Sequence, residues 1–277
     1  MKWIIKIPNF LGGLCPAYWA NSYPSIGNAN QAGKMKNIDL TDPAGMTQGP
    51  GLTTLTQGDE NGAVTDLIKG IIDHSVASDT TYAISNTKLH KLSSTAVAND
   101  GTFPHTITNA TDGQDVAYYH GKIYYSYNTS TEGDIGLYDP SAGTFDDDWG
   151  STVPTGAAAL QGGVPHPLLA AGNDFLYCGN KNYVTSYDGE VFTEKDLDLP
   201  DDAVIQDLEW NYNRLIIAAN RPGISGEKTI GSIYIWDGNS PSWEDEITVK
   251  GEIKSLYVKN NIVYVFWRDL SSMSHIG

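Results

Sequence analysis

A short sequence motif recurs in this chain at a fixed interval. Asp139, Asp188 and Asp237 are successively 49 residues apart, and each follows a Tyr or a Trp. Gly189 and Gly238 come directly after the second and third aspartates, whereas Pro-Ser-Ala-Gly follows the first. Self-similarity at a fixed period of roughly 20–50 residues is the sequence signature of repeat architectures. We therefore expect the chain to be built from repeated structural units.

A second element, two β-rich runs joined by a short polar turn, accompanies this motif. Its four clearest copies are residues 115–128, 166–180, 207–220 and 253–267, and each has Gly or Asn at the reversal. Gly and Asn tolerate the positive φ of tight hairpin turns, and the flanking runs are rich in Val, Ile, Leu and Tyr. We predict four β-hairpins. A weaker copy at residues 71–86 extends the repeat back to position 66.

Each unit is therefore expected to contain a hairpin, a third strand that ends in the aromatic-Asp motif, and a short edge strand. Strand-rich repeats of this kind are typical of β-propeller blades, whose four antiparallel strands must stack on neighbouring sheets. We predict an all-β fold: a β-propeller of about five or more four-stranded blades over residues 66–277, preceded by an N-terminal region, residues 1–65.

The ring is expected to close through its termini, because exposed sheet edges promote aggregation. Lys2–Ile7 is β-rich and is well placed to supply a strand to the last blade. The alternative is that the natural chain continues past Gly277.

The repeated aspartates have a structural interpretation. A carboxylate at the start of a turn accepts hydrogen bonds from nearby backbone N–H groups. We expect Asp139, Asp188, Gly189, Asp237 and Gly238 to form the turns that follow the third strands, with the preceding aromatic packed between blades. The alternative, that these aspartates bind a ligand or metal, is disfavoured because equivalent positions in separate blades point apart.

The segment from position 8 to 62 differs from the rest of the chain. It is rich in Gly, Pro, Asn, Ser and Thr and lacks periodic apolar patterning. Such composition favours an extended arm that is ordered by contact with its own propeller or with another subunit. Its expected assembly anchors are Phe10, Tyr18, Trp19 and Tyr23.

The charge balance restricts the partners. The chain has 33 Asp and Glu against 17 Lys and Arg, a formal net charge of −16 over 277 residues. It offers no basic stripe to neutralise phosphates, so neither nucleic acid nor a membrane surface is expected as a partner. Lys6, Pro8 and Asn9 interrupt the apolar start before a signal-length core forms, which predicts a cytosolic origin.

The chain shows no nucleotide-binding, nucleophile-elbow or metalloprotease motif, and we expect no catalytic residues and no cofactor. The six histidines are scattered and are interpreted as surface or turn residues. Asp146, Asp147 and Asp148 are the candidate calcium ligands, because a loop with several carboxylates suits a hard cation. A solvated loop is the favoured interpretation, since the spacing differs from that of a calcium-binding loop.

Residues 28–58, NANQAGKMKNIDLTDPAGMTQGPGLTTLTQG, carry a family resemblance. This segment resembles the opening of β-propeller-type structural proteins of tailed bacteriophages and related uncultured viruses. In such proteins an Asn-Ile-Asp-Leu strand and a Thr-Gln-Gly-Pro-Gly-Leu turn lead into the blades. The resemblance implies a virion component of the tail or the capsid exterior, with no enzymatic residues to carry over.

The predicted function is therefore a non-enzymatic virion scaffold, assembled in the host cytoplasm. Its expected partners are other virion proteins and copies of itself. One alternative is a propeller at the tail tip that binds a host receptor or glycan through the loops Ser126–Gly136 and Pro222–Gly231. Another is a sialidase-like, carbohydrate-active enzyme, whose two carboxylates would come from different blades.

Overall fold

The computed structural model describes residues 38–39, 47–48, 56–57, 68–74, 80–92, 96–97, 101–222, 229–268 and 274–276. Within these ranges the regular structure is β-strand, apart from one short helix, α2 (Trp149–Thr152). The predicted all-β class is confirmed. The expected closing strand and the anchors Phe10, Tyr18, Trp19 and Tyr23 lie outside the described residues. Over the part of the chain that is described, no helix has the length and apolar character needed to cross a bilayer.

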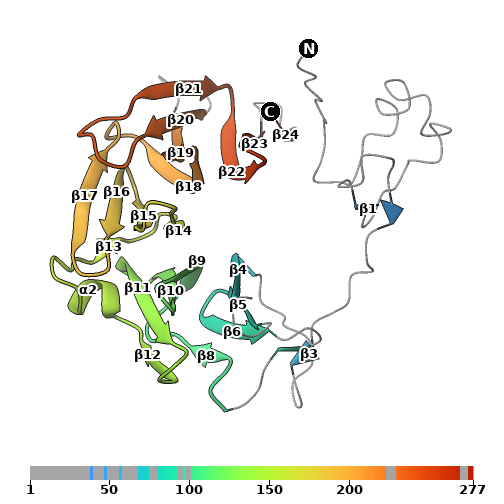
Figure 1. The fold of residues 1–277 in the computed structure, drawn as a ribbon, viewed down its shortest axis with the longest axis vertical. Coiled ribbons are helices and arrows are strands. Elements are labelled where there is room, and N and C mark those ends of the chain that lie inside the picture. The colour runs from blue at the N-terminus through green and yellow to red at the C-terminus, as the bar shows by residue number, and fades with distance from the viewer. Residues whose placement is uncertain are drawn as a thin grey trace.

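Five sheets, antiparallel apart from one parallel pair in the first, follow one another in chain order along an arc (Figure 1). The first sheet contains β4 (Gly70–His74), β5 (Thr80–Ile84) and β6 (Lys88–Leu92), joined by β7 (Ala96–Val97), β8 (His105–Thr106) and β3 (Thr56–Gln57), which pairs parallel with β7. The second contains β9 (Asp112–Tyr119), β10 (Lys122–Asn128), β11 (Glu132–Asp139) and β12 (Thr144–Asp146), with β13 (Leu160–Gln161) paired to β11.

The third sheet contains β14 (Leu168–Ala170), β15 (Leu176–Asn180), β16 (Tyr183–Tyr187) and β17 (Phe192–Asp198). The fourth contains β18 (Val204–Asn211), β19 (Arg214–Arg221), β20 (Ile230–Trp236) and β21 (Asp245–Val249). The fifth contains β22 (Glu252–Lys259), β23 (Ile262–Arg268) and β24 (Ser274–Ile276). A separate pair, β1 (Ile38–Asp39) and β2 (Thr47–Gln48), lies in the N-terminal region.

The four predicted hairpins are confirmed as β9–β10, β14–β15, β18–β19 and β22–β23. Their turns use positive φ as expected: His120 and Gly121 lie at 47° and 81°, and Asn260 and Asn261 at 51° and 62°. Both central residues of a two-residue turn need such angles to match the twist of the flanking strands.

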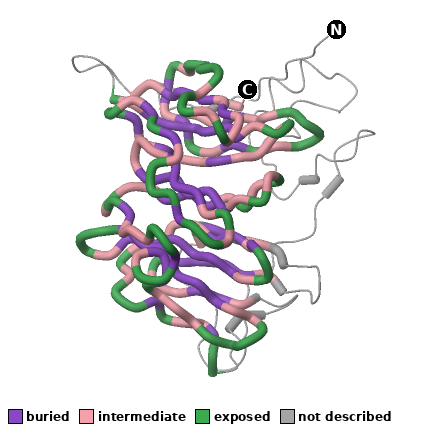
Figure 2. The backbone as a smooth tube through the Cα atoms, turned by 60° about the vertical axis from the view of Figure 1, so that its left-hand side comes forward, coloured by how far each residue is buried: buried purple, intermediate pink, exposed green. Residues whose placement is uncertain are grey.

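The hydrophobic core is divided into four clusters, one between each pair of consecutive sheets. Alternate residues of β10 show why: Ile123, Tyr125 and Tyr127 face the first sheet, whereas Tyr124 packs toward the third. A strand with apolar neighbours on both faces is buried along nearly its whole length. Figure 2 shows this as buried strands between exposed turns.

The two ends of the series have open faces. Ile71 on β4 and Tyr257 on β22 are 61% and 49% exposed. Ile71 corresponds in register to Val116 of the second sheet, which is buried against the first sheet. Tyr257 likewise corresponds to Ala117, which is buried against the third sheet.

Candidate functional site

The three repeated aspartates stand at the ends of β11, β16 and β20, where Asp139 is the last residue of its strand and Asp188 and Asp237 are the first after theirs. Asp139 Oδ1 accepts bonds from the N–H groups of Ser141 and Ala142, at 2.9 and 3.2 Å. Asp188 and Asp237 accept equivalent backbone bonds, at 2.7–2.9 Å. Hydrogen bonds lower the pKa of each carboxyl. The Ser141 hydroxyl, which donates to Asp139 at 2.6 Å, has the largest effect there, and backbone N–H groups have the largest effect on Asp188 and on Asp237, whose pKa falls to about 2. Gly189 and Gly238 follow with φ of 100° and 79°.

The aromatic residue before each aspartate packs toward the preceding sheet. Tyr138 belongs to the cluster shared with the first sheet, Tyr187 packs against the cluster shared with the second, and Trp236 lies in the cluster shared with the third. The aromatic-Asp motif therefore combines an aromatic residue that packs in the core with an aspartate that caps the following turn.

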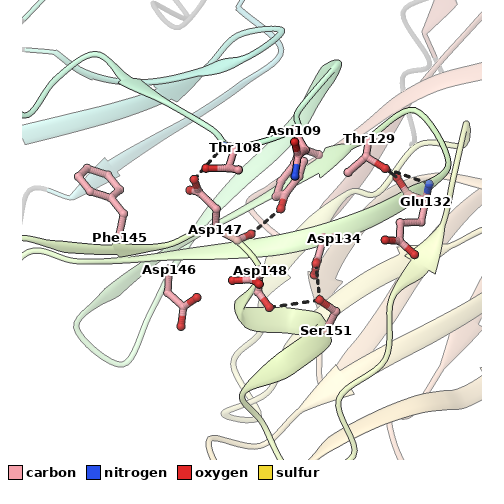
Figure 3. A pocket seen from close by; sticks show the side chains of 11 residues that line it. Thr108, Asn109, Thr129, Glu132, Asp134, Phe145, Asp146, Asp147, Asp148 and Ser151 are labelled. Atoms are coloured by element: carbon pink, nitrogen blue, oxygen red, sulfur yellow. Dashed lines mark hydrogen bonds between the residues drawn. The ribbon is translucent and has the colours of Figure 1, made fainter.

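An acidic pocket of about 470 Å³ opens beside the second sheet (Figure 3). It lies among the segment before β9, the start of β11 and the connection from β12 to α2. Its lining comprises five carboxylates with hydroxyl, amide and ring groups: Thr108, Asn109, Tyr127, Thr129, Glu132, Asp134, Phe145, Asp146, Asp147, Asp148 and Ser151.

Asp147 is the most heavily bonded carboxylate of the acidic pocket. Its Oδ1 accepts from Tyr125 Oη at 2.5 Å and lies 2.8 Å from His105 Nε2, and its Oδ2 accepts from Thr108 N at 2.8 Å. Burial acts to raise its pKa, but these hydrogen bonds outweigh burial and hold the pKa below its ordinary value. The side chain is only 11% exposed. The solvated-loop interpretation is therefore wrong for Asp147, which ties three segments together.

Asp134 has the opposite electrostatic character. Burial raises its pKa to about 6, although a 2.6 Å bond from Ser151 Oγ and a 2.7 Å bond from Ile135 N act to lower it. The pKa of Asp146 is also raised, by burial and then by the neighbouring carboxyl of Asp148. One pocket thus holds a carboxyl that protonates readily beside one that stays ionised.

The ring of Phe145 is not available in the pocket as a stacking platform. His105 and Tyr138 both stack on Phe145, with ring centroids 3.8 and 4.5 Å away, so the faces of that ring are covered. Over the described residues, no three His, Cys, Asp or Glu side chains are grouped to hold a metal ion. The assignment of calcium to Asp146–Asp148 stays a prediction.

A second pocket, of about 260 Å³, lies where β4, β9, β14, β18 and β22 begin; we call these the first strands of their sheets and the cavity the axial pocket. Each sheet contributes residues from an equivalent place at or just before its first strand. The lining residues are Lys69, Gln114, Asp115, Pro165, His166, Pro167, Gln206, Asp207, Lys254 and Ser255. Gly70 takes the place of Asp115 in β4, and a Cβ there would lie 2.8 Å from the Cα of Asp115.

Two axial aspartates, which were not among the candidate residues predicted from the sequence, join neighbouring sheets. Asp115 accepts its own strand's Val116 N–H at 2.8 Å and the Leu168 N–H of the third sheet at 3.0 Å. Asp207 does the same with Leu208, at 2.9 Å, and with Leu256 of the fifth sheet, at 2.6 Å. The repeated Gln-Asp pair at 114–115 and 206–207 was the available signal.

Asparagines at the ends of the second strands form a further set of bonds between sheets. Asn220 donates to Ile253 O and accepts from Ile253 N, both at 2.8 Å. Asn128 bonds in the same two-way manner to Val164 O and Gly163 N, each at 3.0 Å. Each of these hairpins ends in Asn in the sequence, but its partners lie about 35 residues downstream, in a connection or a separate sheet.

The expectation of surface or turn histidines is wrong for two of the six. His166 is fully buried, and burial lowers its pKa. His90 is 4% exposed, and its Nε2 lies 3.0 Å from Ser85 Oγ. His120 does lie in a turn as expected, with its Nε2 2.7 Å from Asp174 Oδ1.

The two axial aspartates and the nearby Glu209 predict a pH-dependent stability. Burial raises the pKa of Asp115 to about 7 and of Asp207 to about 6, and burial with the charge of Asp207 raises that of Glu209 to about 7. Between about pH 4 and about pH 7 these three carboxyls therefore bind more protons in the folded chain than in the unfolded chain. Because the folded state is favoured where it binds the extra protons, the free energy of unfolding should fall as pH rises through this window.

Urea denaturation at about pH 4.5 and about pH 7.5 measures this difference. Asp207→Asn removes one titrating group and should shrink the drop by roughly 1–3 kcal/mol. Glu190→Gln removes an exposed charge outside both pockets and should leave the drop unchanged. An undiminished drop in the Asp207→Asn variant would refute the assignment.

Comparison with known proteins gives no family: no protein-family model and no curated protein matches the chain. Solved structures do resemble it. The extracellular domain described as part of a hybrid two-component system of B. thetaiotaomicron matches with a TM-score of 0.52 and 14% identity, over 79% of this chain and 28% of that chain. The chain thus spans under a third of that protein's length, and the likeness concerns the fold alone.

Two further structures are similar at lower scores. The extracellular domain described as part of a one-component system of the same organism has a TM-score of 0.49 and 13% identity, over 80% of this chain and 28% of that chain. The PQQ-bound aldose sugar dehydrogenase of Streptomyces coelicolor has a TM-score of 0.45 and 10% identity, over 78% and 77%.

Proposed function

We propose that the chain is a β-propeller whose blades are the five sheets, and that it serves as a rigid scaffold in a virion. Support for the radial arrangement comes from the axial pocket, to which equivalent positions of all five sheets contribute. The virion setting rests on the resemblance of residues 28–58 to phage structural proteins.

Stiffness in this scaffold comes from bonds between sheets. Asp115, Asp207, Asn128 and Asn220 each join the hairpin that carries them to backbone groups of the neighbouring sheet or its connection. Buried hydrogen bonds of this kind fix the angle between sheets, because any rotation leaves polar groups unpaired. A rigid body suits a component that must hold its neighbours at fixed positions.

The observation that carries the assembly role is the exposure of Ile71 and Tyr257, at 61% and 49%. Both stand at positions whose equivalents in the second sheet are buried against a neighbour. A large apolar side chain left open at such a position fits a contact with another subunit. We assign this contact to a second copy of the chain.

Quantitative mass spectrometry of purified virions tests the setting. The protein should be present at a fixed copy number per particle. Its absence from particles would overturn the virion role.

Self-association is tested by light scattering on Ile71→Asp and Tyr257→Asp. Each change places a charge in the proposed contact and should weaken association by at least about tenfold. Ile247→Asp is the matched control, because Ile247 is 50% exposed on the outer edge strand β21. A wild-type chain that is monomeric at high concentration, or variants that associate as it does, would contradict the assignment to a second copy.

The acidic pocket favours a second candidate, a carbohydrate-active enzyme whose two carboxylates come from the second sheet and its loops, and not from different blades as the sequence led us to expect. A raised pKa at Asp134 beside a lowered pKa at Asp147 is the division that a general acid and a charged partner require. The loop Ser126–Gly136, named above for recognition, contributes Thr129 and Glu132 to this pocket. Release of labelled sugar from a polysaccharide panel, abolished by Asp134→Asn, would establish it, and no turnover by wild type would exclude it.

A further inference from the structure

The axial pocket has a construction beyond what joining the sheets requires. The first strand of three sheets carries a β-bulge there, since Gln114, Gln206 and Lys254 are each skipped in the pairing with the second strand. A bulge turns a side chain away from the regular alternation and is over-represented next to binding sites. Three bulges at equivalent positions therefore indicate that the cavity lined by these residues is a candidate binding site.

The two bulged glutamines are held in a defined orientation. Gln114 Nε2 donates to the Asp112 carboxylate at 2.7 Å, and Gln206 Nε2 donates to Val204 O at 3.0 Å. Both amide nitrogens are therefore committed to their own strands. Both glutamines line the pocket, and an amide whose nitrogen is bonded in this way keeps its Oε1 as a hydrogen-bond acceptor.

Charges of both signs line the pocket. Asp115 and Asp207 supply carboxylates, and Lys69 and Lys254 supply ammonium groups. The two lysines form ion pairs with Asp112 and Glu252, which are not among the lining residues. A ligand with only one charge would meet repulsion as well as attraction here, whereas a ligand with both charges is complementary.

We propose that the axial pocket binds a small zwitterion that carries one ammonium and one carboxylate group, the chemistry of a free amino acid. The ammonium is recognised by the acceptors Asp115, Asp207, Gln114 Oε1 and Gln206 Oε1, and the carboxylate by the lysines. A cavity of about 260 Å³ is below the usual range for drug-sized ligands and suits a molecule of this size. This binding role goes beyond the scaffold and does not depend on it.

Thermal unfolding of the full chain with each of the twenty free amino acids is the first test, with ethylammonium and acetate as single-charge probes. At least one amino acid should raise the unfolding temperature, because a ligand of the folded state stabilises it. Neither single-charge probe should reproduce the shift. Failure of all amino acids, or an equal shift with ethylammonium or acetate, overturns the proposal.

Calorimetry with the responding amino acid gives a second readout. At about pH 6.5 binding should release protons, because a bound ammonium lowers the raised pKa of Asp115 and Asp207. Lys254→Met and Asp207→Asn should each weaken binding by at least about tenfold, and Glu190→Gln should bind as wild type. Lys254→Met serves if Asp207→Asn fails to fold, since the Lys254 side chain is 48% exposed. Unchanged affinity in Lys254→Met places the site elsewhere and refutes the proposal.

Discussion

Replacing Trp236 by alanine is expected to lower the free energy of unfolding by about 3–5 kcal/mol. Trp236 is fully buried between the third and fourth sheets, and its ring meets Tyr177 edge-on with centroids 5.9 Å apart. Its Nε1–H also donates to Ser240 O at 2.7 Å, inside the turn that Asp237 caps. Removal of the indole ring therefore leaves a cavity between two sheets and loosens a turn. Urea denaturation measures the resulting loss of stability.

Trp236→Phe separates these two effects. Phenylalanine keeps most of the apolar volume but cannot donate to Ser240 O, so its cost should be about 1–2 kcal/mol. The alanine variant should also show a smaller denaturant slope if the two sheets unfold separately. A loss below about 1 kcal/mol in Trp236→Ala would mean that the sheets do not rely on this contact.

The sheets could be predicted from the sequence because the turn residues and β-rich runs that indicate them lie close together within each unit. Hairpins at residues 115–128 and 207–220 follow from a turn residue and its flanking β-rich runs, which interact over a few positions. The aspartates 139, 188 and 237 were likewise interpretable, since the groups that they cap lie two or three residues away. Short-range geometry can be read from a short stretch of chain.

Contacts between units could not be derived in the same way. Asp115 looks like any aspartate at the start of a hairpin, and its bond to Leu168 exists only once the third sheet lies beside the second. The acidic pocket illustrates the same limit. Asp147 meets Tyr125 and His105, which lie 22 and 42 residues away in sequence, so its loop appeared solvated until the sheets were placed.

Replacing Asn220 by alanine is expected to lower the free energy of unfolding by about 2–4 kcal/mol. Its amide pairs with both backbone groups of Ile253, which is fully buried at the start of the fifth sheet. Alanine cannot replace either bond, so one N–H and one C=O are left without partners away from water. The cost exceeds the worth of two ordinary hydrogen bonds because unsatisfied buried groups carry their full desolvation penalty.

Asn239→Ala is the matched control for Asn220→Ala, because Asn239 is exposed in a turn of the same sheet. Its cost should stay within about 0.5 kcal/mol. Hydrogen exchange in the Asn220 variant should rise first in β22 and β23, since the fifth sheet loses its anchor to the fourth. Equal losses in the two variants, or unchanged protection of the fifth sheet, would show that packing alone joins these sheets. The inter-sheet asparagines would then have no special part in the stiffness that a scaffold requires.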